Sequence, residues 1–394
     1  MKKYNFDEMI DRSSHNSLKW DIRNNELPMW VADMDFRTAP GITDAIIKKA
    51  TQGIYGYSVI PHSWEQAIGK WWLERHSFRI DPQWLVFCTG VVPAISSLVR
   101  RLTCTGENVV VQTPVYNIFF NSIVNNGRHI LENPLLFCDG CYSIDFEDLE
   151  RKLSHPETTM LLLCNPHNPV GKIWSREELA RVGDLCQRHH VVVVSDEIHC
   201  DLTRPGYKYV PFASVSEVCR DISVTCIAPS KTFNMAGMQS AAIIAPNEFL
   251  RRRASRGFNT DEVAEPNIFA IDAAVAAYEC GGEWLDELRD YLEESRMITA
   301  EFLEKNIPEA HLIASDATYL LWIDIRQLTT ESERFAAFLR HHTGLWLTAG
   351  DHYGNNGKGF LRLNIACPHA RLSDGLNRLK KGVEAFKQEN NRLS

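Results

Sequence analysis

The sequence predicts an α/β fold: a large domain with a mostly parallel sheet, accompanied by a smaller α+β domain. Short aliphatic runs recur along the chain and are separated by segments with helical periodicity. Continuous apolar runs are typical of strands covered on both faces, as in parallel sheets. Strands that alternate with helices need crossover connections, and these predict an α/β sheet. Beyond these runs the sequence becomes richer in helical patterns, which indicates a second domain.

Two helices are predicted before the first strand of the large domain. One begins at Pro40, and the other spans 61–76. In the second helix Trp64, Trp71 and Trp72 share one face, because their spacings are seven and eight residues. Packing therefore accounts for these tryptophans. Further along the chain, strands are predicted at 84–88, 108–112, 160–164, 191–195 and 222–227, and helices at 92–102, 116–125 and 175–190.

The smaller domain is predicted to combine the two ends of the chain. No linker rich in Gly, Ser or Pro separates the two regions, so the long helix around 285–303 is the expected connection. We therefore expect a large domain over 40–284 and a discontinuous small domain over 1–39 and 285–394. In the C-terminal part, helices are predicted at 267–278, 283–306, 331–342 and 371–387, and strands at 318–325 and 360–365.

The composition excludes several classes of function. The chain has 394 residues, with 42 basic against 50 acidic side chains and a net charge of −8. Nucleic-acid binding and polybasic membrane anchoring need a basic field, so neither a nucleic acid nor a membrane is an expected partner. The 11 cysteines are an odd number spread along the chain, which favours a reducing compartment. Because we find no signal peptide and no bilayer-spanning run, we expect a cytoplasmic protein.

Two polar motifs follow predicted strands, at the edge where open parallel sheets bind ligands. The heptapeptide NPHNPVG is a tight loop that presents Asn165 and Asn168 rigidly. The pentapeptide SDEIH places Asp196 at the end of a buried strand. This carboxylate needs a partner, because a lone buried charge is costly. The candidates are a metal ion with His199 and Asp201 nearby, a protonated ring nitrogen of a cofactor, or a helix N-terminus.

Two further motifs complete a constellation of cofactor-binding groups. APSKTFN puts Lys231 in a loop after an apolar strand, which suits a desolvated lysine that forms a Schiff base. TGVV puts Gly90 at a helix start, where free backbone amides bind anions. A lysine for an imine, a carboxylate for a pyridinium, an amide for a phenolate and a helix start for a phosphate together describe pyridoxal 5′-phosphate (PLP).

The motifs NPHNPVG, SDEIH and SKTFN, in this order, resemble the aspartate aminotransferase superfamily of fold-type I PLP enzymes. The resemblance covers nearly the whole chain and implies a large domain of the seven-stranded type. It implies that Lys231 binds the cofactor covalently, that Asp196 pairs with the pyridine nitrogen and that Asn168 faces the ring hydroxyl. It also implies that Tyr116 stacks on the ring and that Arg362 holds the substrate α-carboxylate.

These assignments define an expected site. Its catalytic residues are Lys231, Tyr116 and Asp196. Its cofactor-binding residues are Tyr57, Gly90, Val91, Val92, Tyr116, Asn165, Asn168, Asp196, His199, Ser230 and Lys231. Its substrate-binding residues are Ala32, Asp33, Asn168 and Arg362.

A closer resemblance lies within that superfamily. The segments SLKW, VADMDF, YGYS and APSKTFN together resemble bacterial carbon–sulfur β-lyases, namely MalY/PatB-type cystathionine β-lyases and cystalysin-type cysteine desulfhydrases. This implies a homodimer with shared active sites, in which Tyr57 reaches the neighbour's phosphate and Ala32 and Asp33 line the substrate pocket. Ala228 and Gln239 stand where many aminotransferases carry a phosphate-binding serine and an arginine, and both departures agree with the lyase branch.

The predicted function is a PLP-dependent α,β-elimination that converts cystathionine- or cysteine-type amino acids to pyruvate, ammonia and a thiol. Lys231 would remove the Cα proton, and Lys231 or Tyr116 would protonate the leaving sulfur. An aminotransferase would use the same residues for its first steps, and a PLP-bound regulatory protein is a third possibility. No metal site is expected, because the CxxC pair Cys138 and Cys141 encloses an Asp-Gly turn and has no second pair at zinc spacing.

Overall fold

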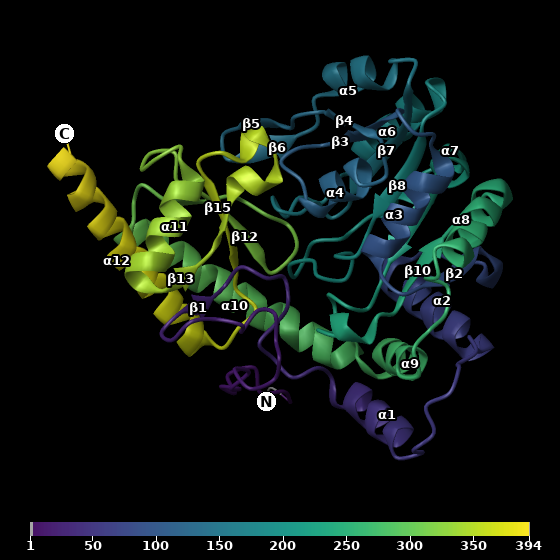
Figure 1. Cartoon of the computed structure of the whole chain (residues 1–394), viewed down its shortest axis with the longest axis horizontal. Helices are drawn as coiled ribbons and strands as arrows, with labels where there is room; N and C mark the ends of the chain where they lie inside the picture. The colour runs from purple at the N-terminus through teal and green to yellow at the C-terminus, as the bar shows by residue number, and fades with distance from the viewer. Residues whose placement is uncertain (1–2, 394) are drawn as a thin grey trace.

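The computed structural model describes residues 3–393 and consists of two lobes that lie side by side (Figure 1). The larger lobe contains a seven-stranded sheet in the order β2-β10-β9-β8-β7-β3-β4. All neighbours pair in parallel except β10, which is antiparallel to both β2 and β9. The predicted mostly parallel sheet is therefore confirmed. Its strands are β2 Leu85–Cys88, β3 Asn108–Val111, β4 His129–Glu132, β7 Thr158–Cys164, β8 Val192–Asp196, β9 Ser223–Ile227 and β10 Ala241–Ile244.

Helices cover both faces of this sheet, as the aliphatic runs predict. Along β7, Met160 and Leu162 belong to the core beneath α3 and α8, whereas Leu161 and Leu163 belong to the core beneath α5 and α6. Successive strand residues point to opposite faces, so a strand buried on both sides must be apolar throughout. The helices of this lobe are α1 Pro40–Ala50, α2 His62–His76, α3 Val91–Leu102, α4 Ile118–Val124, α5 Phe146–Leu153, α6 Arg176–Arg188, α7 Glu217–Asp221, α8 Glu248–Thr260 and α9 Ala270–Cys280.

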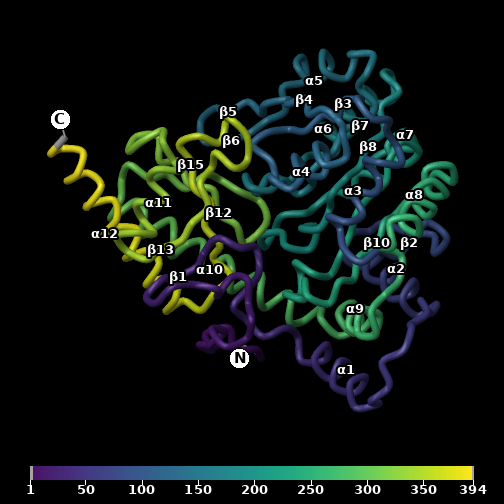
Figure 2. Tube along the Cα trace, viewed as in Figure 1, coloured from purple at the N-terminus to yellow at the C-terminus, as the bar shows by residue number. Residues whose placement is uncertain are grey.

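The smaller lobe contains both ends of the described chain. In Figure 2 the N-terminal segment runs beside the C-terminal lobe, and its strand β1 (Leu27–Pro28) pairs in parallel with β13 (Leu345–Trp346). This pairing supports a discontinuous small domain, although the boundaries at 40 and 285 stay a prediction and residues 1, 2 and 394 lie outside the described residues. Its other elements are α10 Gly282–Asn306, β11 His311–Leu312, β12 Leu320–Asp324, α11 Ser332–Thr343, β14 Thr348–Ala349, β15 Phe360–Asn364 and α12 His369–Leu393.

A short hairpin, β5 (Leu136–Cys138) and β6 (Cys141–Ser143), lies between the two lobes (Figure 1). The three tryptophans predicted to share a face of α2 are all buried, and Trp71 and Trp72 pack against rings from other elements. Within residues 3–393, no helix is both long and apolar enough to cross a membrane.

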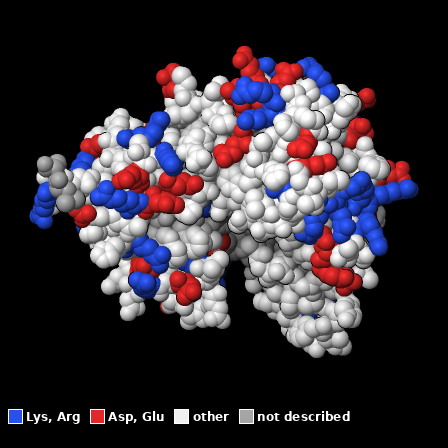
Figure 3. Space-filling view, turned by 45° about the horizontal axis from the view of Figure 1, so that its top comes forward, with Lys and Arg blue, Asp and Glu red and all other residues white. Residues whose placement is uncertain are grey.

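Acidic and basic side chains are interspersed over much of the face shown in Figure 3. One basic group gathers at the right of that view, where α8 carries Arg251, Arg252, Arg253 and Arg256. The lobes are separated by a hollow at the lower edge of the same face.

Candidate active site

The carboxyl ends of three neighbouring strands bring the sequence motifs together. In the sheet register Cys164 of β7 lies beside Asp196 of β8, and Asp196 lies beside Cys226 of β9. The loops that carry Asn168 and Lys231 therefore begin at the same edge as Asp196. Ligands bind at this edge in open α/β sheets because the crossover connections leave a crevice there.

A cavity of about 270 Å³ lies at this edge. Its volume is close to the roughly 300 Å³ at which pockets for small organic ligands begin. The predicted site residues that line it are Ala32, Gly90, Val91, Val92, Tyr116, Asn168, Asp196, His199, Ser230 and Lys231. The lining residues outside the prediction are Thr89, Pro93, Cys164, Ile198, Ala236, Gln239 and Ser240.

Lys231 is the buried amine of this cavity. Its Nζ donates a hydrogen bond to the carbonyl oxygen of Ala32 at 2.7 Å. Burial lowers the pKa of Lys231 to about 8; Asp33 opposes this shift and Arg362 adds to it. A lysine with such a pKa keeps a substantial neutral fraction near physiological pH, and a neutral amine is what nucleophilic attack on a carbonyl requires.

Asp196 is the buried carboxylate of the cavity wall. Its Oδ1 accepts a hydrogen bond from the backbone N–H of Ile198 at 3.2 Å. Burial raises the pKa of Asp196 to about 7, although that N–H and Lys231 oppose the shift. No other described residue forms an ion pair with it, so a cationic ring nitrogen would supply the missing partner.

The start of α3 provides an anion-binding end for the cavity. Gly90, Val91 and Val92 line the cavity there, and the first N–H groups of a helix have no partner within the helix. A Cβ at position 90 would lie 3.2 Å from Cδ of Pro93, so this glycine allows a tight turn into the helix. Nearby, the buried Oγ of Ser240 has no hydrogen-bond partner among the described residues. These groups fit a bound phosphate.

Two ring side chains border the cavity in their neutral forms. Burial lowers the pKa of His199 to about 3, and Lys231 and Arg362 add to this shift. The buried Nδ1 of His199 has no hydrogen-bond partner within residues 3–393. Burial raises the pKa of Tyr116 to about 12, so its hydroxyl keeps its proton at neutral pH. Both rings can therefore contact an aromatic ligand without adding charge.

Arg362 lies beside the cavity, on β15 of the small lobe. Its Nη1 donates to Oδ1 of Asn168 at 3.2 Å, and its Nη2 donates to the carbonyl oxygen of Trp30 at 2.9 Å. The side chain is buried and lies over the ring of Tyr353, 5.0 Å from its centroid. Its Nε has no partner among the described residues, which leaves a donor for an anionic ligand.

Two asparagines that the sequence did not single out, the buried Asn364 and the half-buried Asn234, fix the N-terminal segment over the cavity. Nδ2 of Asn364 donates to the carbonyl oxygens of Val31 and Asp33, at 2.6 and 2.7 Å. Asn234 exchanges hydrogen bonds with the backbone of Met34, at 2.9 and 3.0 Å. These contacts hold the backbone around the Ala32 carbonyl that Lys231 contacts. The signal that the sequence offers for these two residues is that each asparagine lies next to apolar residues.

Four predicted site residues are absent from the cavity wall. The side chain of Asn165 donates to the carbonyl oxygen of Val210 at 2.9 Å instead. The carboxylate of Asp33 pairs with Arg12 at 3.0 Å. Arg362 lies beside the cavity wall and contacts Asn168, which is part of that wall, and Tyr57 is fully exposed in the single chain. The roles assigned to these residues stay predictions.

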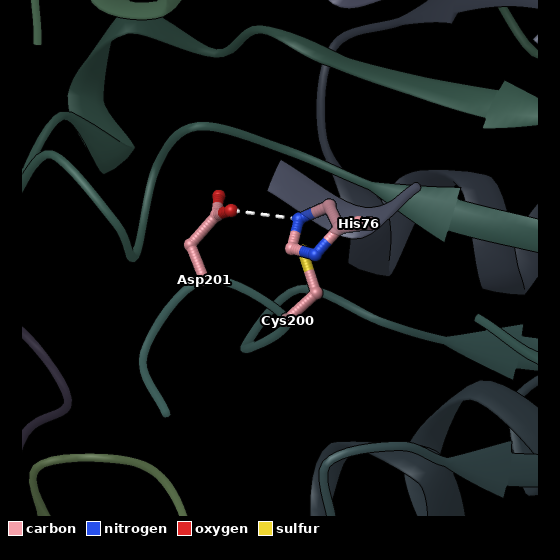
Figure 4. Close-up of side chains that lie close together, drawn as sticks. All are labelled: His76, Cys200 and Asp201. Carbon is pink, nitrogen blue, oxygen red and sulfur yellow. Dashed lines mark hydrogen bonds and ion pairs between the residues drawn. The ribbon is translucent and has the colours of Figure 1, made fainter. Parts of the chain in front are cut away.

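Asp201 supports the lysine loop through Thr232. Its Oδ1 accepts a hydrogen bond from Nε2 of His76 at 2.8 Å (Figure 4). The same oxygen accepts one from Nε1 of Trp71 at 3.0 Å. Its Oδ2 accepts one from Oγ1 of Thr232, the residue after Lys231, at 3.0 Å. Burial opposes ionisation of Asp201, yet the hydrogen bonds, led by that of His76, outweigh burial and lower its pKa. The carboxylate therefore anchors the loop in its charged form.

The residues around Asp201 are also the ones to consider for the alternative in which this region binds a metal ion. One ligand atom each from His76, Cys200 and Asp201 lies within 4.8 Å of the others, a grouping that could hold a metal ion. Both oxygens of Asp201 already accept hydrogen bonds, which account for its burial without an ion. His199, the other residue of that alternative, faces the cavity instead.

Comparisons with known proteins agree with this arrangement. Residues 29–379 match the family model described as aminotransferase class I and II. Cystathionine β-lyase PatB of Bacillus subtilis (strain 168) is 45% identical over 385 residues, covering 96% of this chain and all of the relative. Protein MalY of Escherichia coli (strain K12) is 33% identical over 398 residues, covering 98% of this chain and all of the relative. The crystal structure of cystalysin from Treponema denticola, which contains PLP, superposes with a TM-score of 0.94 at 34% identity, covering 97% of this chain and 99% of that chain.

Proposed function

The chain belongs to the aminotransferase class I and II family, and from this premise we propose that it is a PLP-dependent carbon–sulfur β-lyase. Its substrates are cystathionine- or cysteine-type amino acids, and its products are pyruvate, ammonia and a thiol. The observation that carries the proposal is the cavity in which the buried amine of Lys231, the carboxylate of Asp196 and the start of α3 converge. The full-length similarity to cystathionine β-lyase PatB favours the lyase reaction over others of the family.

The residues around the cavity fit PLP at each of its functional groups. Lys231 would bind the aldehyde carbon, Asp196 would accept the N–H of the ring nitrogen, and Asn168 would contact the ring hydroxyl. The α3 amides at Val91 and Val92 would bind the phosphate, together with the hydroxyls of Ser230 and Ser240. When bound, PLP supplies an aromatic ring that accepts negative charge from the substrate Cα.

The protein side chains then orient the substrate and move its protons. Arg362 would bind the α-carboxylate with a guanidinium that its contacts with Asn168 and Trp30 hold in place. Such positioning aligns the Cα–H bond for removal. The amine of Lys231, neutral above a pKa of about 8, would take the Cα proton. Tyr116 keeps its proton at neutral pH and would donate it to the departing sulfur. Water entering later completes release of pyruvate and ammonia.

The lyase reaction is tested with the purified protein loaded with PLP. Cystathionine or cysteine is supplied without any keto acid, and pyruvate and thiol are measured over time. We expect both products from the wild type and neither from Lys231→Ala, because that variant lacks the amine that removes the Cα proton. Full turnover by Lys231→Ala would contradict the assigned role. Turnover by the wild type only when a keto acid is added would indicate an aminotransferase.

The proposal includes a homodimer with shared sites. Support comes from the segment between α1 and α2, where an unusual number of large apolar side chains are exposed on a single chain: Ile54, Tyr55, Tyr57, Val59 and Ile60. A second copy that covered this segment would bury apolar area and bring Tyr57 near a neighbouring cavity. Sedimentation analysis tests this, with a dimer expected for the wild type and a larger monomer fraction for a variant with Ile54→Ser and Val59→Ser. A wild-type monomer would contradict the proposal.

A further inference from the structure

The hairpin between the lobes places two exposed cysteines opposite each other. Cys138 ends β5 and Cys141 begins β6, and the register pairs them directly. The turn residues Asp139 and Gly140 have φ values of 49° and 76°, as a tight two-residue hairpin turn requires. Cα atoms directly opposed in an antiparallel ladder lie about 4.5–5.5 Å apart, and a disulfide needs about 4.4–6.8 Å. The register therefore brings these two cysteines within the Cα separation that a disulfide needs, although the thiol of Cys138 contacts Oδ2 of Asp139 at 3.5 Å in this structure.

The other described cysteines differ in their surroundings. Cys104 and Cys280 are also exposed, but neither lies in a strand and neither is paired with another cysteine in a sheet register. The remaining seven are buried, where burial favours the unreactive thiol over the thiolate: Cys88, Cys164, Cys186, Cys200, Cys219, Cys226 and Cys367. Among described residues, the hairpin is thus the place where exposure and pairing coincide.

The hairpin also touches the strand pair that holds Arg362. The ring of Phe137 packs edge-on against Phe360 of β15, with 5.7 Å between centroids. The hydroxyl of Tyr142 accepts a hydrogen bond from Nε1 of Trp322 at 3.0 Å. Trp322 on β12 is the direct cross-strand partner of Arg362 on β15. Direct contacts therefore link the hairpin to the strand pair that carries Arg362.

We propose that Cys138 and Cys141 are a reversible thiol–disulfide site that reacts with small-molecule disulfides and tunes the binding of substrate at Arg362. The thiolate of one cysteine attacks the small disulfide RSSR, which forms a mixed protein–S–S–R bond and expels one RS⁻. The thiolate of the other cysteine attacks the protein sulfur of that bond, forms the Cys138–Cys141 disulfide and expels the second RS⁻. Two protein thiols are oxidised, RSSR is reduced to two RSH, and the two thiol protons pass to the two RS⁻ groups.

The first test is chemical and needs no enzymatic activity. The PLP-loaded protein is incubated with oxidised glutathione, alkylated, digested and analysed by mass spectrometry. We expect the peptide with both cysteines to lose two hydrogens, and Cys138→Ser to carry one glutathione on Cys141 instead. Cys104 and Cys280 serve as internal controls, because each can form only a mixed disulfide. Failure of the wild type to form the Cys138–Cys141 bond under excess oxidised glutathione would overturn the proposal.

The second test compares steady-state kinetics of the oxidised and reduced forms, and its direction rests on the proposed lyase function. We expect oxidation to raise KM for the amino-acid substrate roughly threefold to tenfold, the effect of weakening one hydrogen bond to the carboxylate, with kcat nearly unchanged. Dithiothreitol should reverse the change, and Cys138→Ser should not show it. Equal KM values for the two forms would overturn the tuning role. Absence of any lyase activity would refute the proposed function while the mass result still decides whether the disulfide forms.

Discussion

Replacing the lysine of the cavity should make the cofactor-free protein more stable at neutral pH. Burial lowers the pKa of Lys231 from 10.5 to about 8, a depression of about 2.5 pH units. Each unit corresponds to roughly 1.4 kcal/mol, so keeping this charge buried costs about 3 kcal/mol at pH 7. Between pH 8 and 10.5 the unfolded chain binds more protons at this site than the folded chain, so the stability of the wild type rises with pH. By pH 10 the cost should fall to about 1 kcal/mol.

The variant Lys231→Met removes the titrating amine and keeps a similar side-chain volume. Urea unfolding of the cofactor-free wild type and variant at pH 7 and pH 10 measures the difference between them. We expect Lys231→Met to be the more stable protein at pH 7 by about 3 kcal/mol, and this advantage to shrink by about 2 kcal/mol at pH 10. Contributions from titrating groups that do not interact with Lys231 are common to both proteins and cancel in the comparison, whereas those of Asp196 and His199 change with it. A difference that does not change with pH would refute the low pKa of Lys231.

Four further substitutions test the remaining groups. Arg362→Lys should lower kcat/KM for amino-acid substrates about 100-fold, because lysine cannot form the bidentate pair with a carboxylate, and unchanged kcat/KM would remove Arg362 from the site. Asp196→Asn should reduce lyase turnover by at least about 100-fold with the fold retained by circular dichroism, since an amide cannot stabilise a protonated ring nitrogen; near-normal turnover would exclude that pairing. Asp201→Asn should lower the free energy of unfolding by about 3 kcal/mol and Thr232→Val by about 1 kcal/mol, measured in urea; equal stability of all three proteins would show that Asp201 does not anchor the loop.

The fold was predictable because its strands are buried on both faces. Their aliphatic runs appear directly in the sequence, and all five runs are strands of the sheet. Two other strands of this sheet were missed. Ala241–Ile244 is half alanine and follows a loop, and His129–Glu132 lies at the sheet edge, where burial on both faces is not needed. Strands of these kinds are defined by their neighbours in space and not by their own composition.

Part of the candidate site was predictable, namely the residues whose sequence motif directly follows a predicted strand. Asp196, Asn168 and Lys231 meet because their strands are parallel neighbours, so the loops that follow them leave from the same edge of the sheet. The contacts of Asn364 and Asp201 were not predictable, because their partners lie far away in the sequence. Asn364 bonds to residues more than 330 positions away, and Asp201 bonds to a helix end about 125 positions away. Residues joined over such separations can be identified only after folding brings them together.

Elimination of sulfur from an amino acid at this site leaves the substrate nitrogen as free ammonia, so the fate of that nitrogen distinguishes a lyase from an aminotransferase. Cystathionine is supplied together with an excess of a keto acid, and free ammonia, pyruvate, thiol and the amino acid made from the added keto acid are measured in one sample. We expect equal amounts of ammonia, pyruvate and thiol, with no nitrogen transferred to the added keto acid. Transfer of the nitrogen to the keto acid, without release of thiol, would contradict it.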